Sequence, residues 1–205
     1  MRFEDHADAG RQLAKKLENH KGEDEVTIRR RIYIFGDSLA MGHFDYEQGG
    51  WAERLRLDIE KRHKAEVVVY ALGISGAKAE DLDGIIESEV EHRRQDPGPV
   101  HIILQVGTND VPSKWNPVGT DIDEFKTSLT NVIEQAKKYQ TVMFLSLTKV
   151  ASDSYAGHTN EEMEKYNRVI QEVCEKENVK CIDLFGLDLE LDEDGLHPNA
   201  EGHKK

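Results

Sequence analysis

The chain has 205 residues, of which 33% are charged and 38% are hydrophobic, and its formal net charge at pH 7 is -13. This length suits one domain with a substantial core, and the acidic balance argues against nucleic-acid partners, because phosphate binding needs clustered lysine and arginine. No apolar stretch is long enough to span a bilayer and residues 1–25 lack the apolar core of a signal peptide, so we expect a cytoplasmic protein without membrane insertion.

The N-terminal residues differ in character from the rest of the chain. Leu13 and Leu17 lie at i, i+4 spacing in a charged segment, which predicts a short helix followed by a linker. We therefore expect residues 1–25 to form an N-terminal extension and residues 26–205 to form the main domain.

Five short apolar segments, several of them rich in β-branched residues, indicate strands. They cover residues 31–35, 67–70, 100–106, 142–145 and 179–184. The continuous apolar run from Ile32 to Phe35 is typical of a strand that is buried on both faces of a parallel sheet.

Helical patterns alternate with these strands. One apolar stripe follows Gly50, and a second runs from Leu82 to Val90. Two more stripes begin after capping signals, which are Asp121 with Glu124 and Thr159 with Glu162. A further helix is expected to start at Pro198. Strict alternation of strands and helices predicts an α/β protein, a three-layer α/β/α sandwich around a five-stranded parallel sheet.

Residues suited to catalysis, either a polar side chain or a glycine turn, follow four of the five predicted strands at the point where each strand ends. They are Ser38 after the first, Gly73 after the second, Asn109 after the third, and Asp194 with His197 after the fifth. The carboxyl ends of parallel strands meet at one edge of the sheet, so these groups should converge. A hydroxyl, an imidazole, a carboxylate and amide donors together make up the inventory of nucleophilic acyl transfer. Each of them alone is also a common turn or cap residue.

These blocks resemble those of the SGNH hydrolases, also called GDSL esterases and lipases. The segment 36–39 (Gly-Asp-Ser-Leu) is similar to the family's first block, Gly73 to the second, 107–110 to the third and 194–199 to the fifth. The matches follow in order over residues 32–203. The resemblance implies a flavodoxin-like fold and a carboxylic ester hydrolase that needs no cofactor.

The resemblance also implies a role for each residue. Ser38 would be the nucleophile, His197 the general base and Asp194 the group that orients His197. The oxyanion hole would combine the backbone N–H groups of Ser38 and Gly73 with the side-chain amide of Asn109. Glycine at position 73 would let a substrate carbonyl approach the backbone closely.

Other site hypotheses have weaker support in the sequence. The segment 73–77 (Gly-Ile-Ser-Gly-Ala) approaches the Gly-x-Ser-x-Gly nucleophile elbow, but Ala77 replaces the last glycine, which makes Ser75 a lesser candidate. His197, His203 and Asp183 form no recognisable metal motif. Cys174 and Cys181 suit small core residues better than a disulfide.

The resemblance implies a small-molecule ester as substrate, but the sequence does not specify its structure. The loops 40–49, 111–120 and 148–160 are short and contain no obvious lid, which favours an open groove for short acyl chains. They supply possible apolar or stacking walls: Met41, Phe44, Tyr46, Trp115 and Tyr155.

Two other functions stay open at this point. One is a carbohydrate O-deacetylase, an activity found in the same family. The other is a non-catalytic binding module with the same fold, although such members usually lose the serine or the histidine. Family members also continue into a C-terminal helix, whereas this chain stops at residues 203–205, so we expect that helix to be cut short.

Overall fold

The computed structural model describes residues 30–94 and 97–205. Within them, five parallel strands form one sheet in the order β2-β1-β3-β4-β5, which is the flavodoxin-like order. The strands are β1 (Arg30–Gly36), β2 (Val67–Gly73), β3 (Val100–Gln105), β4 (Thr141–Leu145) and β5 (Lys180–Ile182). The order reverses between β1 and β3, and ligands of such sheets bind at the carboxyl ends of the strands near this point.

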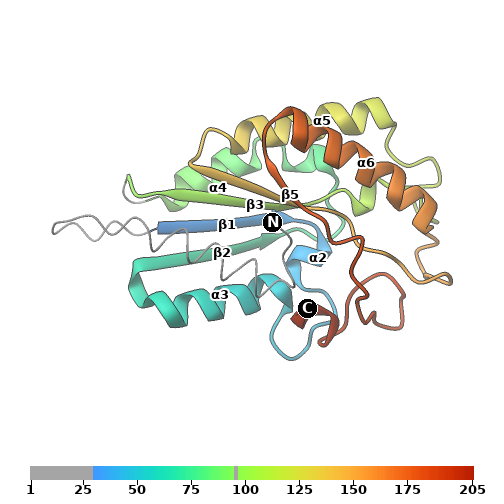
Figure 1. The fold of residues 1–205 in the computed structure, drawn as a ribbon, viewed down its shortest axis with the longest axis horizontal. Helices are drawn as coiled ribbons and strands as arrows, with labels where there is room; N and C mark the ends of the chain where they lie inside the picture. The colour runs from blue at the N-terminus through green and yellow to red at the C-terminus, as the bar shows by residue number, and fades with distance from the viewer. Residues whose placement is uncertain (1–29, 95–96) are drawn as a thin grey trace.

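Helices cover both faces of the sheet (Figure 1). One face carries α3 (Gly50–His63), and the other carries α4 (Ile85–Arg93), α5 (Ile122–Ala136) and α6 (Asn160–Lys176). The four-residue helix α2 (Ser38–Met41) follows β1 directly. Four 3-10 turns complete the described elements: η1 (Lys64–Glu66), η2 (Ala79–Leu82), η3 (Thr108–Asp110) and η4 (Gly202–Lys204). The predicted three-layer α/β/α sandwich is therefore confirmed.

The central strand β1 explains why the sheet needs two helical layers. Its side chains alternate: Tyr33 and Phe35 pack into the core beneath α4, α5 and α6, while Ile32 and Ile34 pack into the core beneath α3. All four are 0% exposed, so the continuous apolar run does mark a strand buried on both faces.

The helices begin where the capping signals predicted. The Asp121 carboxylate accepts hydrogen bonds from the Asp123 and Glu124 amides, and the Thr159 hydroxyl accepts one from the Glu162 amide. These bonds satisfy backbone donors that the first turn of a helix leaves free.

Two helix predictions were wrong in detail. The stripe from Leu82 to Val90 is divided into η2 and α4, because Gly84 has a left-handed φ of 72° that interrupts the helix. Pro198 starts no helix: it bridges to Leu191, and the Asn199 side chain accepts hydrogen bonds from the next amides, which produces a turn.

Some sequence-based expectations concern residues at the margins of the structure. The expected N-terminal extension, residues 1–25, lies outside the described residues.

In the part that is described, no helix combines the length and apolarity that a bilayer crossing requires. Cys174 on α6 is buried, Cys181 on β5 is half-buried, and both are free thiols.

Candidate active site

The predicted site residues converge at the carboxyl ends of the strands. Ser38 begins α2 directly after β1, Gly73 ends β2, and Asn109 lies in η3 after β3. Asp194 and His197 belong to the long loop after β5, which runs beside α2 at the same end of the sheet in Figure 1. The loop reaches Ser38 directly, because the His197 ring contacts the Ser38 hydroxyl.

The turn that presents Ser38 is tightly packed. Gly36 has no room for a side chain, since a Cβ there would lie 2.1 Å from the Gln105 carbonyl oxygen on β3. The Asp37 carboxylate then accepts a hydrogen bond of 2.9 Å from the Leu39 amide and caps α2. Ser38 is thereby held at a buried strand-to-helix turn with 7% of its surface exposed.

Ser38, His197 and Asp194 form a hydrogen-bonded chain. The His197 Nδ1–H donates to Asp194 Oδ2 over 2.5 Å, and the Ser38 hydroxyl donates to His197 Nε2 over 2.8 Å. A carboxylate can only accept, so Asp194 places the imidazole proton on Nδ1 and leaves Nε2 free to take a proton. This is the geometry that activates a serine hydroxyl.

Asp194 is held in its ionised form. Burial raises its pKa, but hydrogen bonds from the His197 ring and from the Leu196 and His197 amides outweigh burial, so the pKa of Asp194 lies below its ordinary value. The two amide bonds, 2.9 and 3.0 Å long, go to Oδ1 and leave Oδ2 for the imidazole. One short loop therefore fixes both the carboxylate and the ring.

The structure gives a further physical reason for a glycine at position 73, besides the expected approach of a substrate carbonyl. A Cβ on Gly73 would lie 2.2 Å from the Met41 amide nitrogen, so the position has no side chain because β2 packs against the backbone of α2. The close approach is thus made by the protein's own helix. Gly73 also pairs in register with Gly36 on β1.

Asn109 is half-buried, and its side-chain amide donates a hydrogen bond of 3.0 Å to the Ala77 carbonyl. This bond ties η3 to the loop that follows β2. An amide group carries two N–H donors, so one of them remains available for an anionic oxygen.

The rival assignments fare differently in the structure. Ser75 lies in an exposed turn, and the hydroxyl next to His197 Nε2 belongs to Ser38. Asp183 accepts from Ser146 and from the Phe185 amide. Within residues 30–94 and 97–205, no three potential ligands are grouped closely enough to hold a metal ion.

Sequence reasoning named Phe44 only as a possible wall of the pocket and did not single out the histidines near His197. The His43 ring lies 5.1 Å from the His197 ring, and Phe44 meets it edge-on at 5.3 Å. Phe44 has a left-handed φ of 64°, a strained conformation for an aromatic residue that concentrates at functional sites. His158 is also buried, donates from Nδ1 to the Pro112 carbonyl and has its pKa lowered mainly by burial. None of these residues carries a motif; only their place in the fold identifies them.

Two buried carboxyl groups lie behind the site and were also missed. Asp37 and Asp110 are both 0% exposed. Asp110 accepts a hydrogen bond of 2.9 Å from the Ala79 amide. Burial raises the pKa of Asp37 to about 7 and that of Asp110 to about 6, and the proximity of Asp110 adds to the rise at Asp37.

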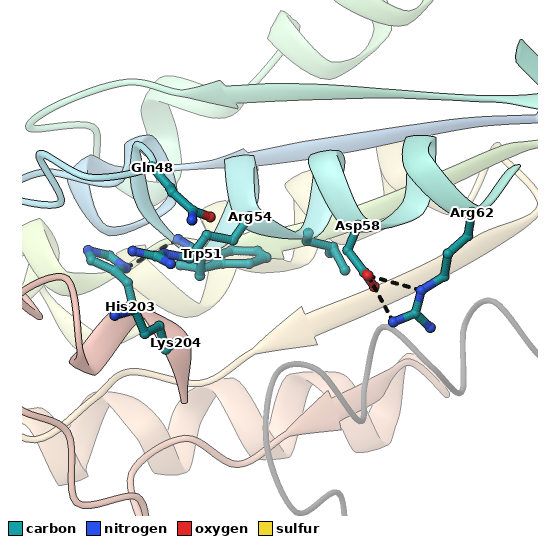
Figure 2. A pocket seen from close by; sticks show the side chains of 8 residues that line it. Gln48, Trp51, Arg54, Asp58, Arg62, His203 and Lys204 are labelled. Carbon is teal, nitrogen blue, oxygen red and sulfur yellow. Dashed lines mark hydrogen bonds and ion pairs between the residues drawn. The ribbon is translucent and has the colours of Figure 1, made fainter. Parts of the chain in front are cut away.

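Two cavities in the described chain lie away from Ser38. Figure 2 shows one, of about 230 Å³, between α3 and the C-terminal turn η4. Its cations Arg54, Arg62 and Lys204 are each paired with carboxylates. The other, of about 360 Å³, lies between the loops after β4 and β5. None of the predicted site residues lines either cavity.

Comparison with solved structures finds the same fold in other proteins. The lipase/acylhydrolase from Enterococcus faecalis superposes with a TM-score of 0.70, at 24% identity over 85% of this chain and 90% of that one. The acetylxylan esterase Axe2 from Geobacillus stearothermophilus gives a TM-score of 0.63, at 18% identity over 87% and 92% of the two chains. These likenesses concern the fold, which they confirm.

Comparison by sequence identifies the family. A multidomain esterase from Ruminococcus flavefaciens is 30% identical over 112 residues, which are 52% of this chain and 14% of that much longer protein. The profile of the GDSL-like lipase/acylhydrolase family matches residues 34–205. The chain therefore belongs to the GDSL-like lipase/acylhydrolase family, as its sequence motifs predicted.

Proposed function

We propose that the chain hydrolyses esters with short acyl groups through a covalent acyl-enzyme, with Ser38 as nucleophile, His197 as general base and Asp194 as its orienting carboxylate. The observation that carries the proposal is the continuous hydrogen-bonded chain from Ser38 Oγ through His197 to Asp194. The three side chains come from opposite ends of the described chain. Their convergence favours a catalytic function over a binding module, which would not require this arrangement.

The geometry suits the two half-reactions of acyl transfer. Ser38 Oγ attacks the ester carbonyl carbon while its proton passes to His197 Nε2, and Asp194 stabilises the resulting imidazolium. Collapse of the tetrahedral intermediate breaks the bond to the alcohol oxygen, which takes the proton from Nε2. A water molecule then gives a proton to His197 and attacks the acyl carbon, which releases the acid and restores Ser38.

The negative oxygen of the tetrahedral intermediate needs donors. We assign this role to the backbone N–H groups of Ser38 and Gly73 and to the Asn109 side-chain amide. Two observations support the assignment: β2 brings Gly73 against α2, and Asn109 uses its amide to bond Ala77. Donors that are held in advance stabilise charge as it develops, and each is worth about 3–4 kcal/mol of barrier lowering.

Labelling with an alkyl fluorophosphonate tests the nucleophile directly. Ser38 Oγ should attack the phosphorus and expel fluoride, and mass mapping should find the added group on Ser38. Ser75→Ala should be labelled like the parent protein, because Ser75 is exposed in a turn and the hydroxyl that contacts the imidazole belongs to Ser38. Ser38→Ala should not be labelled. Modification of another serine, or no labelling of folded protein, would refute the assignment.

The acyl group should be short. Met41, at the end of the helix that Ser38 begins, and Ile74, next to Gly73, are 42% and 41% exposed, which favours an open site over one that encloses a long chain. With 4-nitrophenyl esters of increasing acyl length, kcat/KM should be highest for acetate to butyrate and fall at least about tenfold by decanoate. A maximum at decanoate or beyond would contradict this expectation.

A second candidate is deacetylation of carbohydrate esters. The specific observation in its favour is an exposed pair of aromatic rings, Trp115 and Tyr155, on loops next to the Asp194–His197 loop. The similar structure from Geobacillus stearothermophilus is named an acetylxylan esterase, which agrees with this direction.

A further inference from the structure

Trp115 and Tyr155 stand out from the apolar residues of the structure. They are 69% and 65% exposed, yet their rings contact each other, with centroids 5.6 Å apart and planes inclined by 55°. Large aromatic side chains that gather in solvent on loops mark binding surfaces more often than single exposed apolar residues do. The pair is therefore a candidate ligand-binding surface.

The two rings are held by a rigid frame. Ser113 and Asn116 close a turn around Trp115 with hydrogen bonds of 2.9 and 3.1 Å. The Lys114 amide donates to the Ala156 carbonyl over 2.8 Å and thereby joins the two loops. Preorganised rings lose little freedom when a ligand binds, which favours recognition.

The frame is continuous with the candidate active site. The Tyr155 amide donates to the Asp194 carbonyl over 2.8 Å, and the Ala151 amide donates to the Gly195 carbonyl over 2.8 Å. A ligand on the rings would thus lie beside the loop that carries Asp194 and His197. That is a suitable place for the alcohol portion of an ester whose carbonyl faces Ser38.

The chemistry of the pair indicates the class of ligand. Lys114 Nζ lies over the Tyr155 ring at 5.2 Å from its centroid and occupies one face, so the other face and the inclined indole form an open corner. In the described part of the chain, neither the Trp115 indole N–H nor the Tyr155 hydroxyl is hydrogen-bonded to protein. Apolar faces combined with free polar tips match a pyranose ring, which presents C–H groups on its faces and hydroxyls at its rim.

We propose that Trp115 and Tyr155 form a carbohydrate platform that holds a neutral pyranose ring of the ester's alcohol portion. This inference rests on the proposed ester hydrolysis for its catalytic consequence, but the platform itself would bind sugar without any reaction. An inclined pair suits the puckered sugar ring, whereas a flat aromatic ligand would be better served by parallel walls.

The kinetic test compares two acetate esters. Acetylated xylo-oligosaccharide carries sugar in its alcohol portion, and 4-nitrophenyl acetate does not. The double variant Trp115→Ala/Tyr155→Ala should lower the ratio of the two kcat/KM values at least about tenfold, mainly through the KM of the sugar ester. Val118→Ala is the matched control, because Val118 is 86% exposed on the same loop, and its ratio should equal that of the parent. An unchanged ratio in the double variant, including equal losses on both esters, would overturn the proposal.

A binding test separates the platform from catalysis. Non-acetylated xylotetraose is titrated into the parent protein and into the double variant, with binding followed in both by NMR chemical shifts of the backbone amides. Millimolar binding in the parent that disappears in the double variant supports the platform, even if neither ester is hydrolysed and the proposed function fails. No binding to the parent, or equal binding to both proteins, overturns the platform while leaving Ser38 chemistry unaffected.

Discussion

Replacing His197 with alanine is expected to lower kcat for 4-nitrophenyl acetate by about four to six orders of magnitude. The imidazole has two duties that no neighbour can take over, since Nε2 accepts the Ser38 proton and later delivers it to the leaving alcohol. His158 is nearby and buried, but its Nδ1 is committed to the Pro112 carbonyl. KM should change little, because the ring acts on the transition state and contributes little to ground-state binding.

The measurement needs a folded variant and a control variant with unchanged activity. Circular dichroism and thermal melting should show that His197→Ala keeps the native fold, since the ring lies at the surface end of the sheet with 9% of the residue exposed. Ser75→Ala serves as the matched control and should retain the parental kcat. If His197→Ala kept more than about one hundredth of the activity, another base would have to be sought.

Much of the fold follows from local patterns. In a chain that alternates strands and helices, the apolar run at Ile32–Phe35 indicates a strand buried on both faces. Asp121 and Thr159 mark the starts of their helices, because each accepts hydrogen bonds from amides of the first turn. Gly84 shows the limit of such patterns. The apolar stripe around it continues as if in one helix, while the left-handed backbone at Gly84 divides the stripe in two.

The site was predictable to a similar extent. Residues that react occur in ordered blocks, so Ser38, Asp194 and His197 could be found in the sequence and are adjacent in space. The contacts that shape the site could not be predicted: Phe44 was a candidate wall residue, but its contact with His197, and that of His43, spans 153 or more positions of sequence. Gly73 belongs to both groups: its position was predictable, but its close neighbour is the backbone of α2.

The buried carboxyl group next to Ser38 leads to a prediction about stability. Asp37 is 0% exposed. Burial raises its pKa to about 7, and the proximity of Asp110 adds to the rise, although interactions with the Leu39 amide and with Thr108 oppose the shift. In the unfolded chain an aspartate has a pKa of about 3.9. Between these two values the native state keeps a proton that the unfolded state has lost.

The sign of the effect follows from this difference in bound protons. Stability falls as the pH rises wherever the native state binds more protons than the unfolded state, so Asp37 lowers the free energy of unfolding progressively from about pH 4 to pH 7. At about 1.4 kcal/mol for each pKa unit, the loss above pH 7 is on the order of 4 kcal/mol. Asp194, whose pKa is lowered, acts in the opposite sense and only at acidic pH.

Asp37→Asn should remove this dependence. Asparagine keeps the oxygen that accepts from the Leu39 amide but never ionises, so the variant should be more stable than the parent at pH 8.5, and the difference should shrink towards pH 5. For a domain of this size, where 1 kcal/mol shifts Tm by about 2–4 °C, we expect a Tm difference of about 8–16 °C at pH 8.5. Glu134→Gln, which also neutralises one carboxylate but on an exposed helical position, should shift Tm by less than about 1 °C at either pH. Parallel pH profiles for the parent and Asp37→Asn would mean that Asp37 has an ordinary pKa, and the carboxylate beside Ser38 would then be ionised throughout the working range of the enzyme.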